Sequence, residues 1–242
     1  MDVPTDVAPL SARSVVLSLL LGAHPARLTT AELTRAGDHV GVASATLRVA
    51  LSRAVAAGDL VRFDGGYQLG ERLTSRQARQ DEGVEDAESE WDGSWEMAVV
   101  VVTGRSGAER AALREELSGA RLAELREGVW TRPANLRRSP AYAADPVLST
   151  FRSVPDEDPA ELAARLWDLP AWADTGRRIL AQLGAAIAPA DRLAAAAHLV
   201  RHLTSDPLLP PGLLPADWPG AELRDAYSAY QQELLTLTRQ TA

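Results

Sequence analysis

Apolar residues recur at helical spacing in three short segments near the start of the chain. The first covers residues 11–23 and the second residues 29–41, and each opens with a Ser or Thr that can cap a helix. In the third, residues 42–60, one apolar stripe with i, i+3, i+4, i+7, i+8 spacing is formed by Leu47, Ala50, Leu51, Ala54 and Val55. We therefore expect three helices, the third of which has one apolar and one polar face.

Two short strand-like runs follow the third helix, LVRF at 60–63 and YQL at 67–69. Between them lies Asp64-Gly65-Gly66, whose glycines tolerate the positive φ that a tight hairpin needs. Three helices and then a hairpin are the order of a winged helix, which we assign to residues 1–80. The following residues are highly charged, so 81–94 is interpreted as a linker, and part of the charged stretch from residue 74 is expected to be helical.

A run of apolar, β-branched residues, WEMAVVVV, opens a second block at Trp95. Such a run suits a central strand that is buried on both faces. An amphipathic helix over 106–120 follows, then one or two strands within 121–136 and another strand at 149–154. This order predicts a ferredoxin-like α+β domain over 95–155.

The remaining residues, 156–242, have a helical pattern except at 206–220, where five prolines exclude a continuous helix. We assign them to a helical C-terminal domain. The fold class expected for the whole chain is α+β multidomain, with an N-terminal winged helix, a central ferredoxin-like domain and the C-terminal helices.

Charge is divided unevenly along the chain. Residues 1–80 hold nine Arg against seven acidic residues, a net +2, whereas residues 81–242 hold sixteen Arg against twenty-six acidic residues, a net −10. An acidic body repels DNA and leaves the N-terminal end to approach it, so this end is the candidate nucleic-acid end. No apolar run is long enough to cross a membrane, and we expect a cytoplasmic protein.

The polar face of the third helix carries the side chains that DNA binding requires. Donors at a helix end can contact bases and phosphates in the major groove, and a hairpin can reach the flanking backbone. The candidate DNA-binding residues are Ser44, Thr46, Arg48, Ser52, Arg53 and Arg62. The alternative is that they are solvated polar residues of a small helical bundle, and Asp64 at the hairpin tip counts against strong phosphate binding.

Residue types needed by several enzyme classes are missing. The chain has no Cys, and all 25 of its basic residues are Arg, so thiolate, Schiff-base and P-loop chemistry are excluded. His198 and His202 stand four apart on one predicted helix without an HExxH motif, and the sequence has no GxSxG or dinucleotide-binding glycine motif. The acidic residues of 81–92 are interpreted as a solvated spacer, and we expect no enzyme activity, metal or cofactor.

Several stretches together resemble the PaaX family, the repressors of phenylacetic acid degradation operons. They are GVASATLRVALSRAVAAGDL, in which Arg48 and Arg53 match two spaced arginines of the family's recognition helix, then WDGSWEMAVVVV, EGVWTRPANL, WDL at 167–169 and DPLLPPGLLPADWPGAELR. The resemblance covers about residues 11–239. It implies a homodimeric repressor with a winged helix, a Cas2-like ferredoxin domain and a C-terminal helical domain for dimerisation and effector binding. It also implies release of the DNA by an aryl-CoA thioester, typically phenylacetyl-CoA.

The sequence departs from the family pattern at three places. Residues 101–104 read Val-Val-Thr-Gly where the family has an acidic residue and a Pro-Glu pair, so a carboxylate for a Cas2-type nuclease metal is missing. Ala43 replaces a serine that could cap the recognition helix, and Asp64 replaces a more basic wing. These changes affect which operator and effector are expected, and they leave the expected fold unchanged.

The resemblance leads to a specific regulatory scheme. Two chains would set their third helices about one DNA turn, roughly 34 Å, apart on a pseudo-palindromic operator. An effector pocket is expected between the central domain and the C-terminal helices, formed by Trp167, Trp172, Arg177, Arg178, Arg201 and Trp218. The tryptophans also suit a core or a dimer surface. The alternatives are a regulator of another operon without a CoA effector, a protein-interaction adaptor, and a Cas2-type nuclease.

Overall fold

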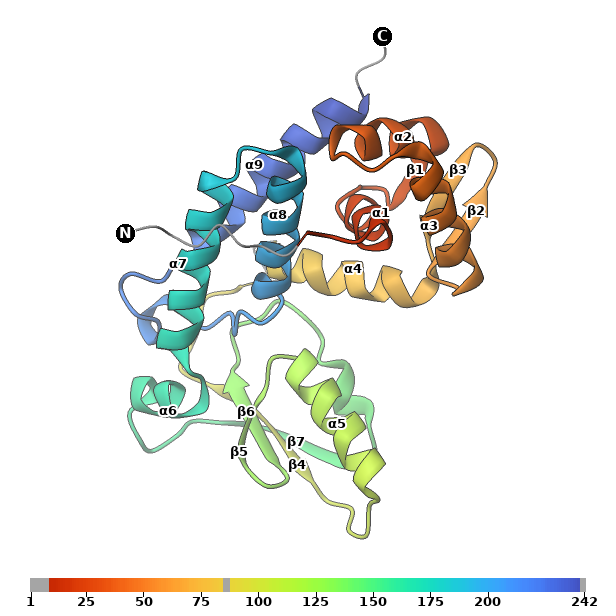
Figure 1. Ribbon diagram of the computed structural model, residues 1–242. Coiled ribbons are helices and arrows are strands. Elements are labelled where there is room, and N and C mark those ends of the chain that lie inside the picture. The colour runs from red at the N-terminus through yellow and green to blue at the C-terminus, as the bar shows by residue number, and fades with distance from the viewer. Residues whose placement is uncertain (1–8, 85–87, 240–242) are drawn as a thin grey trace. The chain divides into compact units, whose positions relative to one another are not determined.

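The computed structural model describes residues 9–84 and 88–239, and these form two compact units (Figure 1). Of the described residues, the first unit holds 9–84, 175–204 and 219–239, and the second holds 88–174 and 205–218. Both units therefore contain residues of the block assigned to the C-terminal helices. The domain boundaries expected from the sequence follow the order of the elements and stay predictions.

The first unit begins with the three expected helices and the hairpin. Its elements are α1 (Ala12–Leu21), β1 (Arg27–Thr29), α2 (Thr30–His39), α3 (Ser44–Ala56), β2 (Leu60–Phe63), β3 (Gly66–Leu69) and α4 (Glu71–Val84). Ser11 caps α1 by accepting a hydrogen bond from the Ser14 backbone, and Thr29 and Glu32 form a capping box at α2. The helices and caps expected from the sequence are thus confirmed.

The hairpin belongs to a three-stranded antiparallel sheet of order β1-β3-β2. Gly65 turns the chain with a φ of 87°, and a Cβ on Gly66 would collide with the Leu28 carbonyl oxygen. The short strand β1 was missed in the sequence, because its three residues alternate too briefly to show a strand period. Its pairing places Arg27 opposite Gln68 on the hairpin.

Asp59, just after α3, ties the first unit together. Its carboxylate is fully buried and accepts hydrogen bonds from Arg13 on α1 and Arg72 on α4. Burial alone would raise the pKa of Asp59, but the hydrogen bonds from the two arginines outweigh it and hold the pKa below its ordinary value. Figure 1 shows α1 nearly end-on among α2, α3 and α4, so this carboxylate links the start and the end of the bundle.

Asp59→Asn is expected to lower the stability of the first unit by about 2 kcal/mol at pH 7, because it removes a charged acceptor from two arginines. A depressed folded-state pKa stabilises the fold above the unfolded value, and this contribution is lost as the pH falls below about 4. The variant and the wild type should therefore differ less at pH 3 than at pH 7. Thermal melts followed by circular dichroism measure both. The exposed Asp64→Asn is the matched control, and an equal loss there would contradict this role for Asp59.

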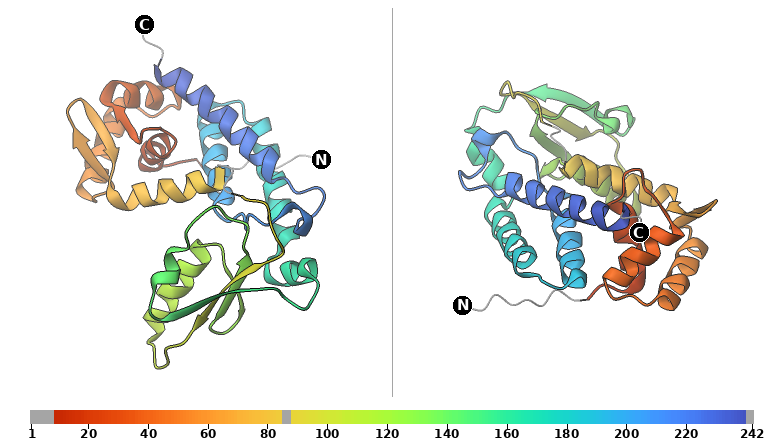
Figure 2. Two further views of the ribbon diagram at one scale, coloured as in Figure 1. Left: turned by 180° about the vertical axis from the view of Figure 1, so that it is seen from behind. Right: turned by 90° about the horizontal axis from the view of Figure 1, so that it is seen from above.

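The linker expected from the sequence begins as a helix, since α4 continues to Val84. The Gln77 side chain of α4 is buried and donates hydrogen bonds of 2.9 Å to the carbonyl oxygens of Leu21 and Ala23. Helix α4 packs on α8 (Pro189–Leu203), and α9 (Gly220–Arg239) packs on α2 and α8, as both views of Figure 2 show. The N-terminal helices thus share a core with the last two helices of the chain.

The second unit is built on a four-stranded antiparallel sheet of order β5-β6-β4-β7. Its elements are β4 (Trp95–Val100), α5 (Gly107–Gly119), β5 (Ala123–Arg126), β6 (Val129–Pro133), the 3₁₀ turn η1 (Ala141–Ala144), β7 (Leu148–Ser153) and α6 (Pro159–Leu166). These follow the ferredoxin-like order of strand, helix, strand, strand, helix, strand, with η1 in the place of the second helix. Helix α7 (Leu169–Ala185) comes next and spans the boundary between the units.

The expectation that the WEMAVVVV strand is buried on both faces is confirmed only at its start, between Trp95 and Ala98. Ala98 is fully buried in a cluster with Leu113 and Leu117 of α5, but the strand ends at Val100. Val101 is 53% exposed, and Phe151, the partner of Met97 on β7, is 55% exposed. Helix α5 covers one face of this sheet, and the other face is buried around Trp95, which packs with Leu162 of α6. An apolar run does not show how far such cover extends.

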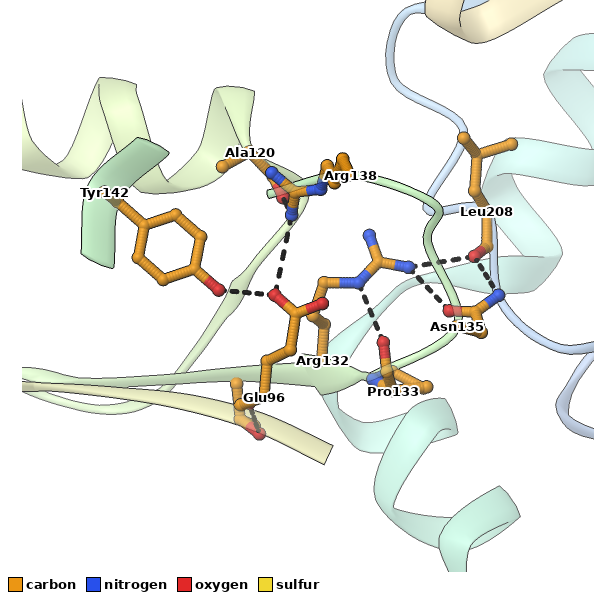
Figure 3. Close-up of polar contacts among 9 residues, drawn as sticks. Glu96, Ala120, Arg132, Pro133, Asn135, Arg138, Tyr142 and Leu208 are labelled. Carbon is orange, nitrogen blue, oxygen red and sulfur yellow. Dashed lines mark hydrogen bonds and ion pairs between the residues drawn. The ribbon is translucent and has the colours of Figure 1, made fainter. Parts of the chain in front are cut away.

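The proline-rich segment 206–215, which includes the 3₁₀ turn η2 (Pro211–Leu213), is held by a buried arginine of β6 (Figure 3). Arg132 is fully buried and donates hydrogen bonds to the carbonyl oxygens of Pro133, at 2.9 Å, and Leu208, at 3.0 Å. It also contacts the Asn135 side chain, which itself binds the Leu208 carbonyl. Burial lowers the pKa of Arg132 to about 9, so it stays charged at neutral pH.

Candidate nucleic-acid interface

Helix α3 has the two faces that the sequence predicts. Leu47, Ala50, Leu51 and Ala54 are buried against the rest of the first unit. The polar candidates Thr46, Arg48, Ser52 and Arg53 are all exposed, and Ser44 at the first turn is half-buried. The structure therefore brings five of the six candidate residues onto one helix, on the side away from its core.

The start of α3 lacks a side-chain cap. Ala43 occupies the N-cap position without a side-chain hydrogen bond, and the preceding Gly41 has a φ of 76°. The Ser44 hydroxyl lies 3.5 Å from a carboxylate oxygen of Asp38. The first backbone N–H groups of α3 are thus left without a side-chain acceptor, which suits them to an incoming phosphate oxygen.

Both arginines of α3 are available to a partner. Within the described residues, neither Arg48 nor Arg53 has a hydrogen bond or ion pair to another group. Val49 lies between them in the sequence and is 51% exposed, although valine is among the residue types that are most often buried. Two cations, two hydroxyls and an exposed apolar side chain match the edges of base pairs, where guanine offers acceptors and thymine a methyl group.

The three-stranded sheet adds two further cations. Arg62 of β2 donates a hydrogen bond of 3.1 Å to the Tyr67 hydroxyl and lies 5.4 Å from the centre of that ring. Arg27 of β1 stacks on Phe63 at 4.4 Å. Arg27 was not among the candidate residues expected from the sequence, because HPARL at 24–28 shows no strand period. Asp64 is exposed at the turn, as expected.

The candidate effector residues are divided between the two units. Trp167, Trp172 and Trp218 belong to the second unit, whereas Arg177, Arg178 and Arg201 belong to the first. The Trp172 and Trp218 rings stack with centroids 4.3 Å apart and planes at 12°, and Trp167 packs against Trp95 at 6.4 Å. These contacts give the tryptophans a role in the core, and the effector pocket stays a prediction.

Neither a cluster of metal-ligating side chains nor a membrane-spanning helix is found among the described residues. Across 9–84 and 88–239, no group of three or more His, Asp and Glu side chains is arranged to hold a metal ion. Burial lowers the pKa of His198, and the nearby Arg201 and Arg178 lower it further. None of the described helices is long and apolar enough to cross a membrane.

Comparison with known proteins gives consistent matches along the chain. Residues 11–73 match the family model of a PaaX-like protein, residues 88–148 the PaaX protein central Cas2-like domain, and residues 167–242 the PaaX-like protein C-terminal domain. Among solved structures, the chain is similar to the uncharacterized protein Rv0674 from Mycobacterium tuberculosis, with 46% identity and a TM-score of 0.81 over 94% of this chain and 97% of that one. No curated protein matches the sequence.

Proposed function

The chain belongs to the PaaX family, and from this premise we propose that it is a transcriptional regulator that binds operator DNA through α3. In this proposal α1 to α3 and the hairpin form a winged helix, α3 is the recognition helix, and the hairpin is the wing. Arg48 and Arg53 contact bases and phosphates in the major groove, and Arg62 and Arg27 contact the flanking backbone.

One observation carries the proposal. The exposed face of α3 holds two arginines without partners among the described residues, beside an uncapped helix start. These arginines stand in the first 80 residues, which carry a net charge of +2 in a protein of net charge −8. A face that leaves its cations unpaired is suited to a polyanion.

The working unit is proposed to be a homodimer. Closed two-fold pairs are the commonest soluble oligomers, and a two-fold pair of recognition helices reads two half-sites about one helical turn apart. The expected operator is therefore pseudo-palindromic. The acidic remainder of the chain keeps DNA at the N-terminal end of each protomer.

The proposed role is repression of an aromatic-acid catabolic operon that an aryl-CoA thioester relieves. Support for this part comes from the family resemblance. A thioester can release DNA only if it binds the free protein more tightly than the DNA-bound protein.

The test is a fluorescence-anisotropy titration of the full chain with DNA from upstream of its own gene, over 50 to 200 mM salt. A labelled fragment of unrelated sequence is the control. We expect specific binding whose affinity falls with salt along a slope of about −0.9 for each phosphate contacted, and weakening upon addition of phenylacetyl-CoA. Binding that no CoA ester changes would remove the effector from the proposal. A chain without salt-dependent DNA affinity would instead be an adaptor.

A further inference from the structure

The first unit contains a cavity of about 190 Å³ between two pairs of helices. One side is formed by α1 and α4 and the other by α8 and α9, and all four helices belong to the same compact unit. For comparison, a cavity of about 150 Å³ in a protein core accommodates benzene. The space is therefore large enough for one aromatic ring with a short substituent.

The wall of this cavity is mostly apolar. Leu17 and Leu21 of α1, Leu193 and Val200 of α8, and the rings of Tyr227 and Tyr230 on α9 all line it. Burial raises the pKa of both tyrosines, so their hydroxyls stay protonated and neutral. Such a wall favours an apolar ligand of limited size.

The charged residues of the wall are all cations. Arg13, Arg76 and Arg201 line the cavity, and its described lining contains no carboxylate. Arg13 donates to the buried Asp59 carboxylate, whereas among the described residues no ion pair joins Arg201 to a carboxylate. The charge of Arg201 favours a ligand that carries a negative charge.

Gln80 of α4 provides a second, independent indication of a ligand. Its side chain is 3% exposed and lines the cavity, yet its Oε1 atom has no hydrogen-bond partner among the described residues. A buried acceptor that stays unpaired costs about 1–3 kcal/mol, so proteins seldom keep one without a reason. Gln80 and Arg201 both line the cavity, so a donor at Gln80 and an anion at Arg201 fit a single small molecule.

We propose that this cavity binds a small aromatic molecule that carries a hydrogen-bond donor on its ring and an anionic group at its other end. The ring packs among the leucines and tyrosines, the ring donor binds Gln80 Oε1, and the anion faces Arg201. The residues differ from those expected at the tryptophans, with Arg201 as the only shared residue.

The location also suggests how the ligand acts, and this part rests on the proposed function. Helix α1 lines the cavity and packs directly on α3, and it also contacts α8. A ligand between α1 and α8 that prefers one spacing of these helices shifts the position of α3. Ligand binding and DNA binding are then coupled, and each changes the affinity of the other by the same factor.

Binding is tested by calorimetry of the full chain with three matched compounds. They are 3-(4-hydroxyphenyl)propionate, 3-phenylpropionate, which lacks the donor, and 3-(4-hydroxyphenyl)propan-1-ol, which lacks the charge. We expect the hydroxy acid to bind at least fivefold more tightly than either of the others. Its CoA thioester, run alongside, shows whether a carboxylate or the phosphates of CoA supply the anion. A hydroxy acid that binds no better than both controls would overturn the proposal.

Two variants assign the binding to this cavity. Gln80→Leu should reduce the preference for the hydroxy acid over 3-phenylpropionate to less than about twofold while it leaves 3-phenylpropionate binding intact. Ala197→Leu adds bulk to the partly exposed wall of α8 and should weaken all three compounds at least tenfold. A preference that persists in Gln80→Leu, or affinities unchanged in Ala197→Leu, would place the ligand elsewhere.

Promoter anisotropy with and without the hydroxy acid tests the coupling, with an expected change in DNA affinity of at least fivefold. DNA binding without any compound binding would refute the cavity and leave the proposed function standing. Compound binding that depends on Gln80, in a protein that binds no DNA, would support the ligand site and refute its regulatory role. Both bindings without coupling would refute the regulatory role alone.

Discussion

The double variant Arg48→Ala, Arg53→Ala is expected to weaken binding to the promoter by about a hundredfold or more. Each arginine contact with a base or phosphate contributes about 1–3 kcal/mol, and both residues are exposed on the same helix. Both side chains are exposed and unpaired within the described residues, so their loss leaves the core of the first unit intact. Salt-dependent anisotropy titrations should also show a slope lower by about one for each phosphate contact removed.

Arg126→Ala is the matched control, because Arg126 is also exposed but lies on β5 of the second unit. It should bind the promoter with wild-type affinity and an unchanged salt slope. Circular dichroism melts should give the same transition for the control, the double variant and the wild type. Equal DNA binding by the double variant and the control would remove α3 from the interface.

Arg132→Met is expected to destabilise the second unit by about 3 kcal/mol. The substitution removes hydrogen bonds to Pro133, Asn135 and Leu208, and it leaves buried carbonyl oxygens without these donors. Methionine fills much of the same volume, so the loss reports on polar contacts more than on packing. The substitution also removes the electrostatic attraction between Arg132 and the nearby Glu96 carboxylate. The Arg138 guanidinium remains 3.7 Å from that carboxylate.

Urea unfolding followed by tryptophan fluorescence measures this loss selectively. All six tryptophans of the chain lie in the second unit: Trp91, Trp95, Trp130, Trp167, Trp172 and Trp218. The control is Arg126→Met, the same substitution at an exposed site, which should shift the midpoint little. A free energy of unfolding for Arg132→Met within about 0.5 kcal/mol of the control's value would show that Arg132 does not hold the proline-rich segment.

The hydrophobic pattern alone predicted those elements whose buried residues recur at a regular helical spacing. The stripe Leu47, Leu51 and Ala54 predicted α3, and with it which side chains would be exposed. The two glycines of the hairpin were informative because one needs a positive φ and the other a close approach to Leu28. Such local patterns predict structure correctly because they do not depend on residues far away in the sequence.

Features that depend on residues far apart in the sequence were not predictable. Asp59 appeared only as a charge at the end of a helix, and nothing near it indicated pairing with Arg13, 46 residues away. Arg132 and Leu208 are 76 residues apart, so their hydrogen bond left no local pattern. Burial of a charge is set by the tertiary fold, and polar residue types are usually exposed.

The cavity and the extent of α4 illustrate the same point. The charged composition from residue 74 favoured a partly helical linker, but the helix buries Gln77 and Gln80 against α1 and the C-terminal helices. A helix with few large apolar residues can still be anchored by glutamine side chains that bind backbone carbonyls, as Gln77 does. Sequence periodicity counts apolar residues and does not register such contacts.

Site-directed DNA cleavage from α3 most directly tests whether this helix lies in the operator. Because the chain has no cysteine, Val49→Cys provides one attachment point for an iron–EDTA reagent, and Ile187→Cys, at a side chain 93% exposed on the far segment after α7, provides the control. We expect two clusters of cuts in the promoter about one helical turn apart with the reagent at position 49, and none from position 187. A promoter that is bound but cut no more from position 49 than from position 187 would contradict this expectation.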